Sequence, residues 1–158
     1  MDVERFADIE AEFLARVQKA VYCNMATVDR QNRPRSRVMH PVWEGSVGWI
    51  ISWPETLKSK HLAHNPHVSL AYIRDPYQPV FVDCSAEWIS DRQEQQRVWD
   101  FYTTAPPPMG FDPEPSYGSI DHHYFGLLKL TPWRIELFNL SSEDGVTVMT
   151  SQVWRPTP

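Results

Sequence analysis

The hydrophobic residues near the N-terminus recur with a helical period. Phe6, Ile9, Phe13, Val17 and Ala20 follow one another at intervals of three or four positions, with Glu and Arg among the residues between them. This spacing places the apolar side chains on one face of a helix. The pattern therefore predicts an amphipathic helix over residues 3–20.

Beyond residue 20 the apolar residues are often β-branched or aromatic, and they occur in short runs separated by turn residues. We expect strands over residues 21–28, 35–43, 47–52, 67–73, 80–89, 125–140 and 146–154. The first three, joined by short loops, are predicted to form an antiparallel meander. A short helix is expected over residues 57–64 with Thr56 as its N-cap, and another begins after Asp91.

The expected strands outnumber the helices, and the chain shows almost no alternation of strand, helix and parallel strand. That order argues against a parallel nucleotide-binding sheet and favours an antiparallel barrel with helices at its periphery. We therefore predict a mainly β fold of six to seven antiparallel strands. Residues 1–158 are expected to form a single domain with one hydrophobic core.

A proline-rich loop is predicted over residues 103–119. Pro106, Pro107, Pro108 and Pro113 lie close together there, which argues against regular structure in this segment. Loops of this length inside a compact domain usually serve as lids or binding loops. We expect this loop to lie over the functional site.

Composition and charge narrow the functional classes. Apolar residues make up 42% of the chain, charged residues 22%, and the net charge of −5 argues against a nucleic-acid binder. The N-terminus has no signal-peptide pattern, and no apolar run reaches the roughly 20 residues that cross a membrane. Cys23 and Cys84 both lie in apolar runs. We expect a cytoplasmic protein with two buried thiols, the alternative being a disulfide between them.

Basic residues gather in two short segments that a folded sheet can bring together. Arg35 and Arg37 lie two apart on an expected strand and so share a face, and Lys58 falls in the first turn of the helix that follows Thr56. Backbone N–H groups and the helix dipole favour an anion at such a helix start. If the two segments are adjacent, a phosphate would meet guanidinium, ammonium and hydroxyl donors together. The alternative is that these residues only decorate solvated surfaces.

Four short motifs follow one another in the segment 33–70. They are P-x-x-R at residues 34–37, a strand end with Ser at 51–52, Thr-x-Lys at 56–58 and N-P-x-V-x-L at 65–70. This order resembles the core of the pyridoxamine 5'-phosphate oxidase-like superfamily, the FMN-binding split barrels. Each motif is weak, but they occur in the family's order. The resemblance extends over roughly residues 15–140.

The resemblance implies a cofactor site made of Arg35, Arg37, Val38, Met39, His40, Ile51, Ser52, Thr56 and Lys58. The basic residues and the two hydroxyl groups would hold the phosphate of FMN. Main-chain groups of the strand would face the polar edge of the isoalloxazine ring, and Ile51 would pack near it. The family's proteins are typically homodimers that hold the cofactor between subunits. The prolines after residue 105, together with Tyr117, would form a lid over the ring.

The implied activity is that of an FMN-dependent oxidoreductase acting on a small molecule. The flavin itself carries the redox chemistry in such enzymes, so no catalytic side chain is assigned. Residues 138–144 are neutral to acidic where oxidases of pyridoxamine phosphate carry basic groups, so a different substrate is expected. The alternatives are a reductase that uses the deazaflavin F420, or a protein that binds flavin or haem without turnover. For haem, the candidate ligands are His40, His122 and His123.

The remaining histidines and tryptophans are candidate metal ligands and candidate ring-packing residues, respectively. His61 and His64 lie three apart on the expected short helix, but no recognisable set of further ligands joins them. We therefore predict exposed histidines and no metal site. Trp43, Trp53 and Trp133 are the tryptophans proposed as walls for a planar ring.

Overall fold

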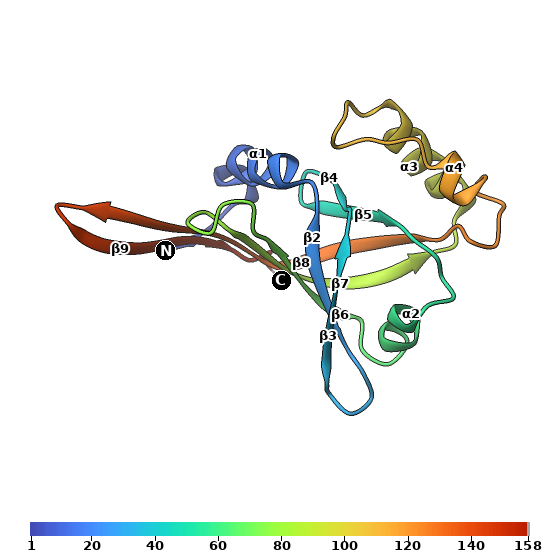
Figure 1. Ribbon diagram of the computed structural model, residues 1–158, viewed down its shortest axis with the longest axis horizontal. Helices are drawn as coiled ribbons and strands as arrows, with labels where there is room; N and C mark the ends of the chain where they lie inside the picture. The colour runs from blue at the N-terminus through green and yellow to red at the C-terminus, as the bar shows by residue number, and fades with distance from the viewer. Residues whose placement is uncertain (158) are drawn as a thin grey trace.

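The computed structural model describes residues 1–157 and consists of one twisted sheet with helices around it (Figure 1). In chain order the elements are β1 (Asp2–Val3), η1 (Phe6–Asp8, a 3-10 helix), α1 (Glu10–Ala20), β2 (Cys23–Val28), β3 (Pro34–Met39), β4 (Val42–Glu44), β5 (Val47–Ile51), α2 (Leu57–Leu62), β6 (His67–Tyr72), β7 (Val80–Ile89), α3 (Arg92–Thr104), α4 (Glu114–Tyr117), β8 (Leu127–Glu143) and β9 (Val146–Trp154). Within residues 1–157, no helix combines the length and the apolar character needed to span a membrane.

The strands form one sheet in the order β1-β9-β8-β7-β6-β2-β3, and β5 adds to β8 while carrying β4 on its other side. The predicted mainly β fold with peripheral helices is confirmed. The sheet has nine strands rather than six or seven. It is mixed rather than wholly antiparallel, because β1 runs parallel to β9.

Strand β8 joins the two halves of the sheet. Its first residues, Leu127 to Leu130, pair with β5 on one side and with β7 on the other. Its later residues pair with β9, and this β8–β9 hairpin extends away from the body of the molecule (Figure 1). The register against β7 shifts where Cys84 lies opposite Pro132, a residue with no N–H to donate.

Two apolar clusters fill the interior. The larger one lies between α1 and the sheet, where alternate residues of the strands such as Met25, Leu70 and Val82 are fully buried. The smaller one lies under α3 and the loop that follows it, around Tyr102. Cys23 and Cys84 are both buried and both free, so the prediction of buried thiols is confirmed.

The predicted strand over residues 35–43 is wrong in one respect, because it is divided into β3 and β4 at His40 and Pro41. Pro41 cannot donate a backbone hydrogen bond, so the ladder with β2 stops at Met39. Strand β4 then pairs with β5, and β5 pairs with β8. The predicted meander of three consecutive strands is therefore replaced by two separate pairings.

The N-terminal helix is shorter than predicted. Helix α1 begins at Glu10, whereas residues 6–8 form the 3-10 helix η1. Asp2 and Val3 pair with the end of β9 instead of joining a helix. The free edge of β9 supplies backbone hydrogen-bond partners for β1. Helical spacing of apolar residues cannot reveal a pairing between segments that lie so far apart in the sequence.

The proline-rich segment also contains more regular structure than predicted. Helix α3 continues to Thr104, and the short helix α4 covers residues 114–117. Asp112 accepts a hydrogen bond from the backbone N–H of Glu114, and Pro115 lies in the first turn of α4, where a missing N–H costs nothing. The chain between the helices packs closely, since a Cβ on Gly110 would lie 2.1 Å from the carbonyl oxygen of Ala105.

Tyr102 ties α3 to the sheet. Its hydroxyl oxygen lies 2.8 Å from the carbonyl oxygen of Trp49 and 3.0 Å from that of His40, and its side chain is fully buried. It thereby fixes the proline-rich segment, which follows α3, next to the break between β3 and β4.

Replacing Tyr102 tests the importance of this link. We expect Tyr102→Phe to lower the free energy of unfolding by about 1–3 kcal/mol, because buried carbonyl groups lose their donor. Urea unfolding followed by tryptophan fluorescence measures the change. Tyr124→Phe is the control, since Tyr124 is 40% exposed. Equal stability of Tyr102→Phe and the native protein would contradict the assignment.

Candidate functional site

The site is built around a buried ammonium group. Lys58 is only 4% exposed, and its Nζ donates to the carbonyl oxygen of Trp53 at 3.2 Å and to Oγ1 of Thr56 at 3.0 Å. It also lies over the ring of Trp88, 5.0 Å from the centroid. The pKa of Lys58 is lowered to about 8, first by burial of the ammonium group and second by the charge of Arg37.

Arg37 is the second cation of the cluster. It lies on β3, half-buried, and its Nη1 donates to the carbonyl oxygen of Met25 on β2 at 3.2 Å. Burial and then the charge of Arg35 lower the pKa of Arg37. The charge of Arg37 lowers the pKa of Lys58, so β3 and the start of α2 bring these two cations into the same neighbourhood.

Neither cation has an acidic partner. Within residues 1–157, Arg37 and Lys58 take part in no ion pair with a carboxylate. Two cations that are partly removed from water and repel each other are unfavourable unless an anion joins them. The cluster therefore has the electrostatic character of an anion site.

Thr56 contributes differently from the prediction. It occupies the N-cap position of α2, but its side chain makes no capping hydrogen bond. Its Oγ1 accepts from Lys58 instead and lies 3.2 Å from Oγ of Ser59. The hydroxyl is drawn to the ammonium group because this bond is charge-assisted. Thr56 thus belongs to the site while being a weaker cap than expected.

A cavity of about 580 Å³ adjoins this cluster along the chain. Its lining is formed by Tyr22, Val38, Met39, His40, Ile51, Ser52, Pro108, Phe111 and Tyr117. Five of these residues, which lie in β3 and β5 or directly after these strands, were predicted as site residues from the sequence. Ser52 connects the two parts of the site, because the next residue, Trp53, supplies the carbonyl that accepts from Lys58.

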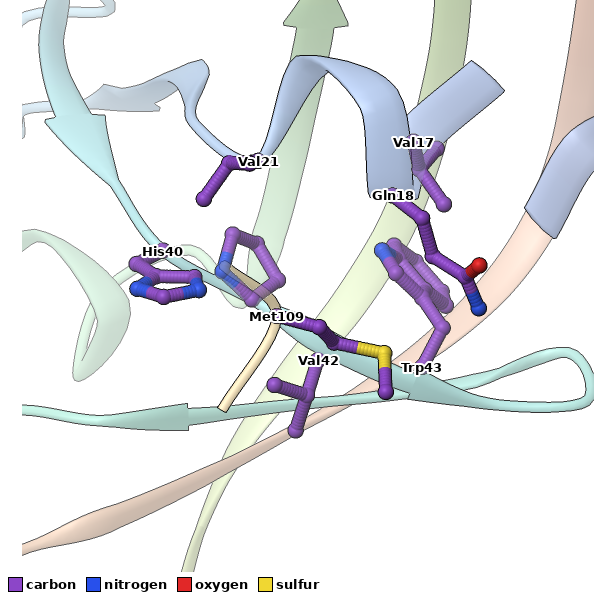
Figure 2. A pocket seen from close by; sticks show the side chains of 8 residues that line it. Val17, Gln18, Val21, His40, Val42, Trp43 and Met109 are labelled. Atoms are coloured by element: carbon purple, nitrogen blue, oxygen red, sulfur yellow. The ribbon is translucent and has the colours of Figure 1, made fainter. Parts of the chain in front are cut away.

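His40 is one of the residues that line this cavity. Its ring lies between those of Tyr22 and Phe111, with both centroid distances equal to 5.2 Å. Burial lowers the pKa of His40, and a hydrogen bond with the Met109 backbone opposes that effect. Its Nε2 is buried and has no partner among the described residues. His40 also borders a second, much smaller cavity next to Val17, Val42 and Trp43 (Figure 2).

The proline-rich segment forms one wall of the larger cavity, as the sequence indicated. Pro108, Phe111 and Tyr117 all line it, and the hydroxyl of Tyr117 donates to the carbonyl oxygen of Ile51 at 3.2 Å. Tyr22 and Phe111 were not predicted as site residues. Tyr22 lies between α1 and β2, and Phe111 follows a run of prolines, so neither belongs to a pattern that the sequence makes visible.

Four residues lie elsewhere than the sequence suggested. Arg35 lines a groove next to α2 rather than the cavity. Trp43 is buried in the core, and Trp133 lies on β8 and does not line the cavity. His61 is 6% exposed, so the prediction of an exposed helix histidine is wrong; buried Thr27 gives it a polar partner, with Oγ1 and Nδ1 2.8 Å apart.

Comparison with known proteins gives the family. A family model described as pyridoxamine 5'-phosphate oxidase matches residues 9–136. The chain belongs to this family. The matched range includes every residue of the cation cluster and all of the predicted cofactor residues. None of the curated proteins compared matches the chain.

Solved structures agree with the family in fold. A pyridoxamine 5'-phosphate oxidase-related, FMN-binding protein from Nostoc punctiforme PCC 73102 has 16% identity and a TM-score of 0.63, over 94% of this chain and 97% of that chain. HutZ, the haem storage protein of Vibrio cholerae, has 20% identity and a TM-score of 0.59, over 78% and 89%. An F420 reductase has 18% identity and a TM-score of 0.55, over 77% and 93%.

These identities establish the fold alone, and the fold is the split barrel expected from the sequence. The three proteins that share this fold are an FMN-binding protein, a haem storage protein and an F420 reductase. The fold therefore does not select the cofactor. The residues of this chain have to do so, and the unpaired cations fit a ligand that carries a phosphate.

The buried lysine predicts an unusual dependence of stability on pH. In the ligand-free protein, folded Lys58 loses its proton at about pH 8, whereas the unfolded chain keeps it to about pH 10.4. The unfolded state then binds more protons, so the free energy of unfolding should rise with pH in this window. We expect a gain of about 1–3 kcal/mol from pH 8 to pH 10 relative to Lys58→Met.

Urea unfolding of both proteins across this pH range measures the difference. Comparison with Lys58→Met removes the contribution of all other titrating groups. Parallel stability curves for the two proteins would show that Lys58 titrates normally and is not desolvated.

Proposed function

We propose that the chain binds FMN and acts as an FMN-dependent oxidoreductase on a small molecule. The observation that carries this proposal is the pair of cations, Arg37 and Lys58, which lacks a carboxylate partner among the described side chains. Val38, the residue after Arg37, lines a cavity of about 580 Å³. A phosphate at the cluster would neutralise both charges. The rest of the ligand would then extend into the cavity.

The residues available for each part of the cofactor are distinct. Arg37, Lys58 and the hydroxyl of Thr56 would hold the phosphate, with Ser52 between the phosphate and the ring. Main-chain groups of Val38 and Met39 in β3, and of His40 directly after it, would face the ring's polar edge. A bound flavin would supply the transfer of electron pairs, for which no side chain of the protein is suited. The contribution of this chain is to bind, orient and partly shield the ring.

The wall formed by the proline-rich segment indicates the type of substrate. Phe111 and Tyr117 present aromatic surface to the cavity, and the described lining contains no Lys or Arg. A substrate phosphate would find no cation there. This agrees with the neutral to acidic stretch over residues 138–144 and supports a substrate other than pyridoxamine phosphate.

The same cluster would accept the phosphate of F420, so that cofactor is the nearest alternative. Haem is less well supported. The Nε2 of His40 is buried, and His122 and His123 are exposed in a loop where they stack on each other with centroids 4.4 Å apart. His40 lines the large cavity, but its unpartnered Nε2 is buried within the protein, and His122 and His123 do not belong to the described lining.

We further propose that a second copy of the chain covers the site. Large apolar side chains are exposed around it, namely those of Tyr22, Val38, Trp53, Leu57 and Tyr124. Trp53 and Tyr124 stack with centroids 4.2 Å apart and nearly parallel rings. Exposed aromatic residues at this density are typical of protein interfaces. A homodimer would shield them together with the cofactor.

The cofactor proposal is tested by removing both cations. We expect Arg37→Ala/Lys58→Ala to weaken FMN binding by about a hundredfold or more, because two charge-assisted contacts to the phosphate are lost. Titration followed by flavin absorbance and fluorescence gives the dissociation constant. Lys19→Ala/Arg74→Ala removes the same charge at exposed positions and should leave it unchanged. Stoichiometric binding of FMN by the double variant would refute the proposed site. Tighter binding of F420 or haemin than of FMN by the native protein would identify that compound as the cofactor instead.

The dimer is tested by charging the exposed aromatic surface. Tyr124→Asp places a carboxylate where the partner would pack, so sedimentation should show a shift from dimer to monomer. Met149→Asp is the matched control, because Met149 is 71% exposed but lies on the distant β8–β9 hairpin. A native protein that sediments as a monomer, or an equal effect of both substitutions, would contradict the interface.

A further inference from the structure

A second basic surface lies next to the proposed phosphate site. It is a groove of about 940 Å³ between the β2–β3 turn and helix α2. The polar side chains that line it and matter here are those of Asp29, Arg30, Arg33, Arg35, Lys60 and His61. In a chain with a net charge of −5, this concentration of cations requires an explanation.

The acidic residue of the groove does not neutralise these cations. Asp29 accepts from the backbone N–H groups of Gln31 and Arg33 at 2.8 and 3.0 Å and from Nε of Arg33 at 2.8 Å. These bonds lower the pKa of Asp29 to about 2. Within residues 1–157, Arg30, Arg35 and Lys60 form no ion pair. The hydrogen bonds of the Asp29 carboxylate go to backbone N–H groups of its turn and to Arg33. It therefore leaves Arg30, Arg35 and Lys60 without a neutralising partner.

The groove also contains a buried polar side chain, that of His61. Its ring is 6% exposed, and Nδ1 is engaged by the hydroxyl of Thr27, which is 2% exposed. The other ring nitrogen, Nε2, has no hydrogen-bond partner among the described residues. A buried histidine held in one orientation therefore borders a groove lined by cations.

The groove and the proposed phosphate site share their elements. Arg35 lies two residues before Arg37 on β3, and its charge lowers the pKa of Arg37. Leu57 and Lys60 of the groove flank Lys58 on α2. A ligand with one phosphate at Arg37 and Lys58 therefore has a basic groove at hand for a further anionic group.

We propose that this groove binds a second phosphate or pyrophosphate group. This group belongs either to the cofactor itself, extending beyond its first phosphate, or to an electron donor bound next to it. The proposal rests on the proposed function for the position of the first phosphate. It adds that the full ligand set carries more than one anionic group, which FMN alone does not.

The experiment uses FMN-loaded protein titrated with inorganic pyrophosphate by calorimetry at low ionic strength. We expect binding to the native protein, and Arg30→Glu/Lys60→Glu should weaken it by about tenfold or more. Both residues are exposed, so the fold should tolerate the change. The control Lys19→Glu/Arg74→Glu has the same net charge and should bind as the native protein does. The dissociation constant of FMN should change by less than about twofold in both variants.

His61 is tested separately. His61→Asn retains a polar atom near the position of Nδ1 for Thr27 but removes Nε2, so pyrophosphate binding should weaken while stability is kept. His61→Gln retains a polar atom near Nε2 and should bind pyrophosphate more tightly than His61→Asn. Tighter pyrophosphate binding by His61→Asn than by His61→Gln would show that His61 does not contact the anion.

Two further ligands distinguish the sources of the anion. FAD should compete with both FMN and pyrophosphate if the second group belongs to the cofactor. Reduced nicotinamide adenine dinucleotide phosphate should bind FMN-loaded protein and displace only pyrophosphate if it belongs to the donor. The proposal is overturned if the native protein binds no pyrophosphate, if the control variant loses binding equally, or if Arg30→Glu/Lys60→Glu weakens FMN as much as pyrophosphate.

Failure of the proposed function gives a different result. If FMN does not bind, the titration is made on ligand-free Arg37→Ala/Lys58→Ala. Suppose that Arg37→Ala/Lys58→Ala still binds pyrophosphate and that adding Arg30→Glu/Lys60→Glu abolishes this binding. The groove would then be supported as an anion site, although the assignment of FMN would be wrong. Loss of pyrophosphate binding in Arg37→Ala/Lys58→Ala would mean that the groove is no separate site.

Discussion

The backbone pairing of β8 on both of its edges is the constraint on which the rest of the structure depends. Residues 127–130 are hydrogen-bonded to β5 and to β7, which brings the end of β5 next to the long central strands. The backbone N–H of Ser52 then donates to the carbonyl of Gly126 at 2.9 Å and directs the chain toward α2. The cavity exists because this pairing holds β5 beside β8 while β3 remains paired to β2 on the other side.

The placement of α2 gives the site its electrostatic character. Lys58 is buried by the fold, with its ammonium group over the ring of Trp88 and against the carbonyl of Trp53, so its charge is poorly hydrated. Arg37 adds a second positive charge from β3. Such an arrangement is costly in a ligand-free protein and becomes favourable when an anion binds, which is a common trade between stability and function.

The sequence and the structure agree on the residues of the site to a large extent, and the disagreements have physical causes. Val38, Met39, His40, Ile51 and Ser52 line one cavity because each lies in β3 or β5 or directly after one of these strands, whose patterns were readable. Tyr22 and Phe111 were missed since they lie in connections, where position depends on distant contacts. His61 was expected at the surface, but the hydroxyl of Thr27, 34 residues earlier, makes its burial tolerable.

The sequence by itself determined the class of fold, most strand positions and the two buried thiols, because these follow from local periodicity and turn residues, and motif order indicated the cations of the candidate site. Only the tertiary structure decided the break at Pro41, the parallel pairing of β1 with β9, the separation of Arg35 from the cavity and the groove beside α2. Each of these depends on which backbone and side-chain groups find partners far away in the chain. Hydrogen bonding and burial across such distances leave no periodic pattern in the sequence.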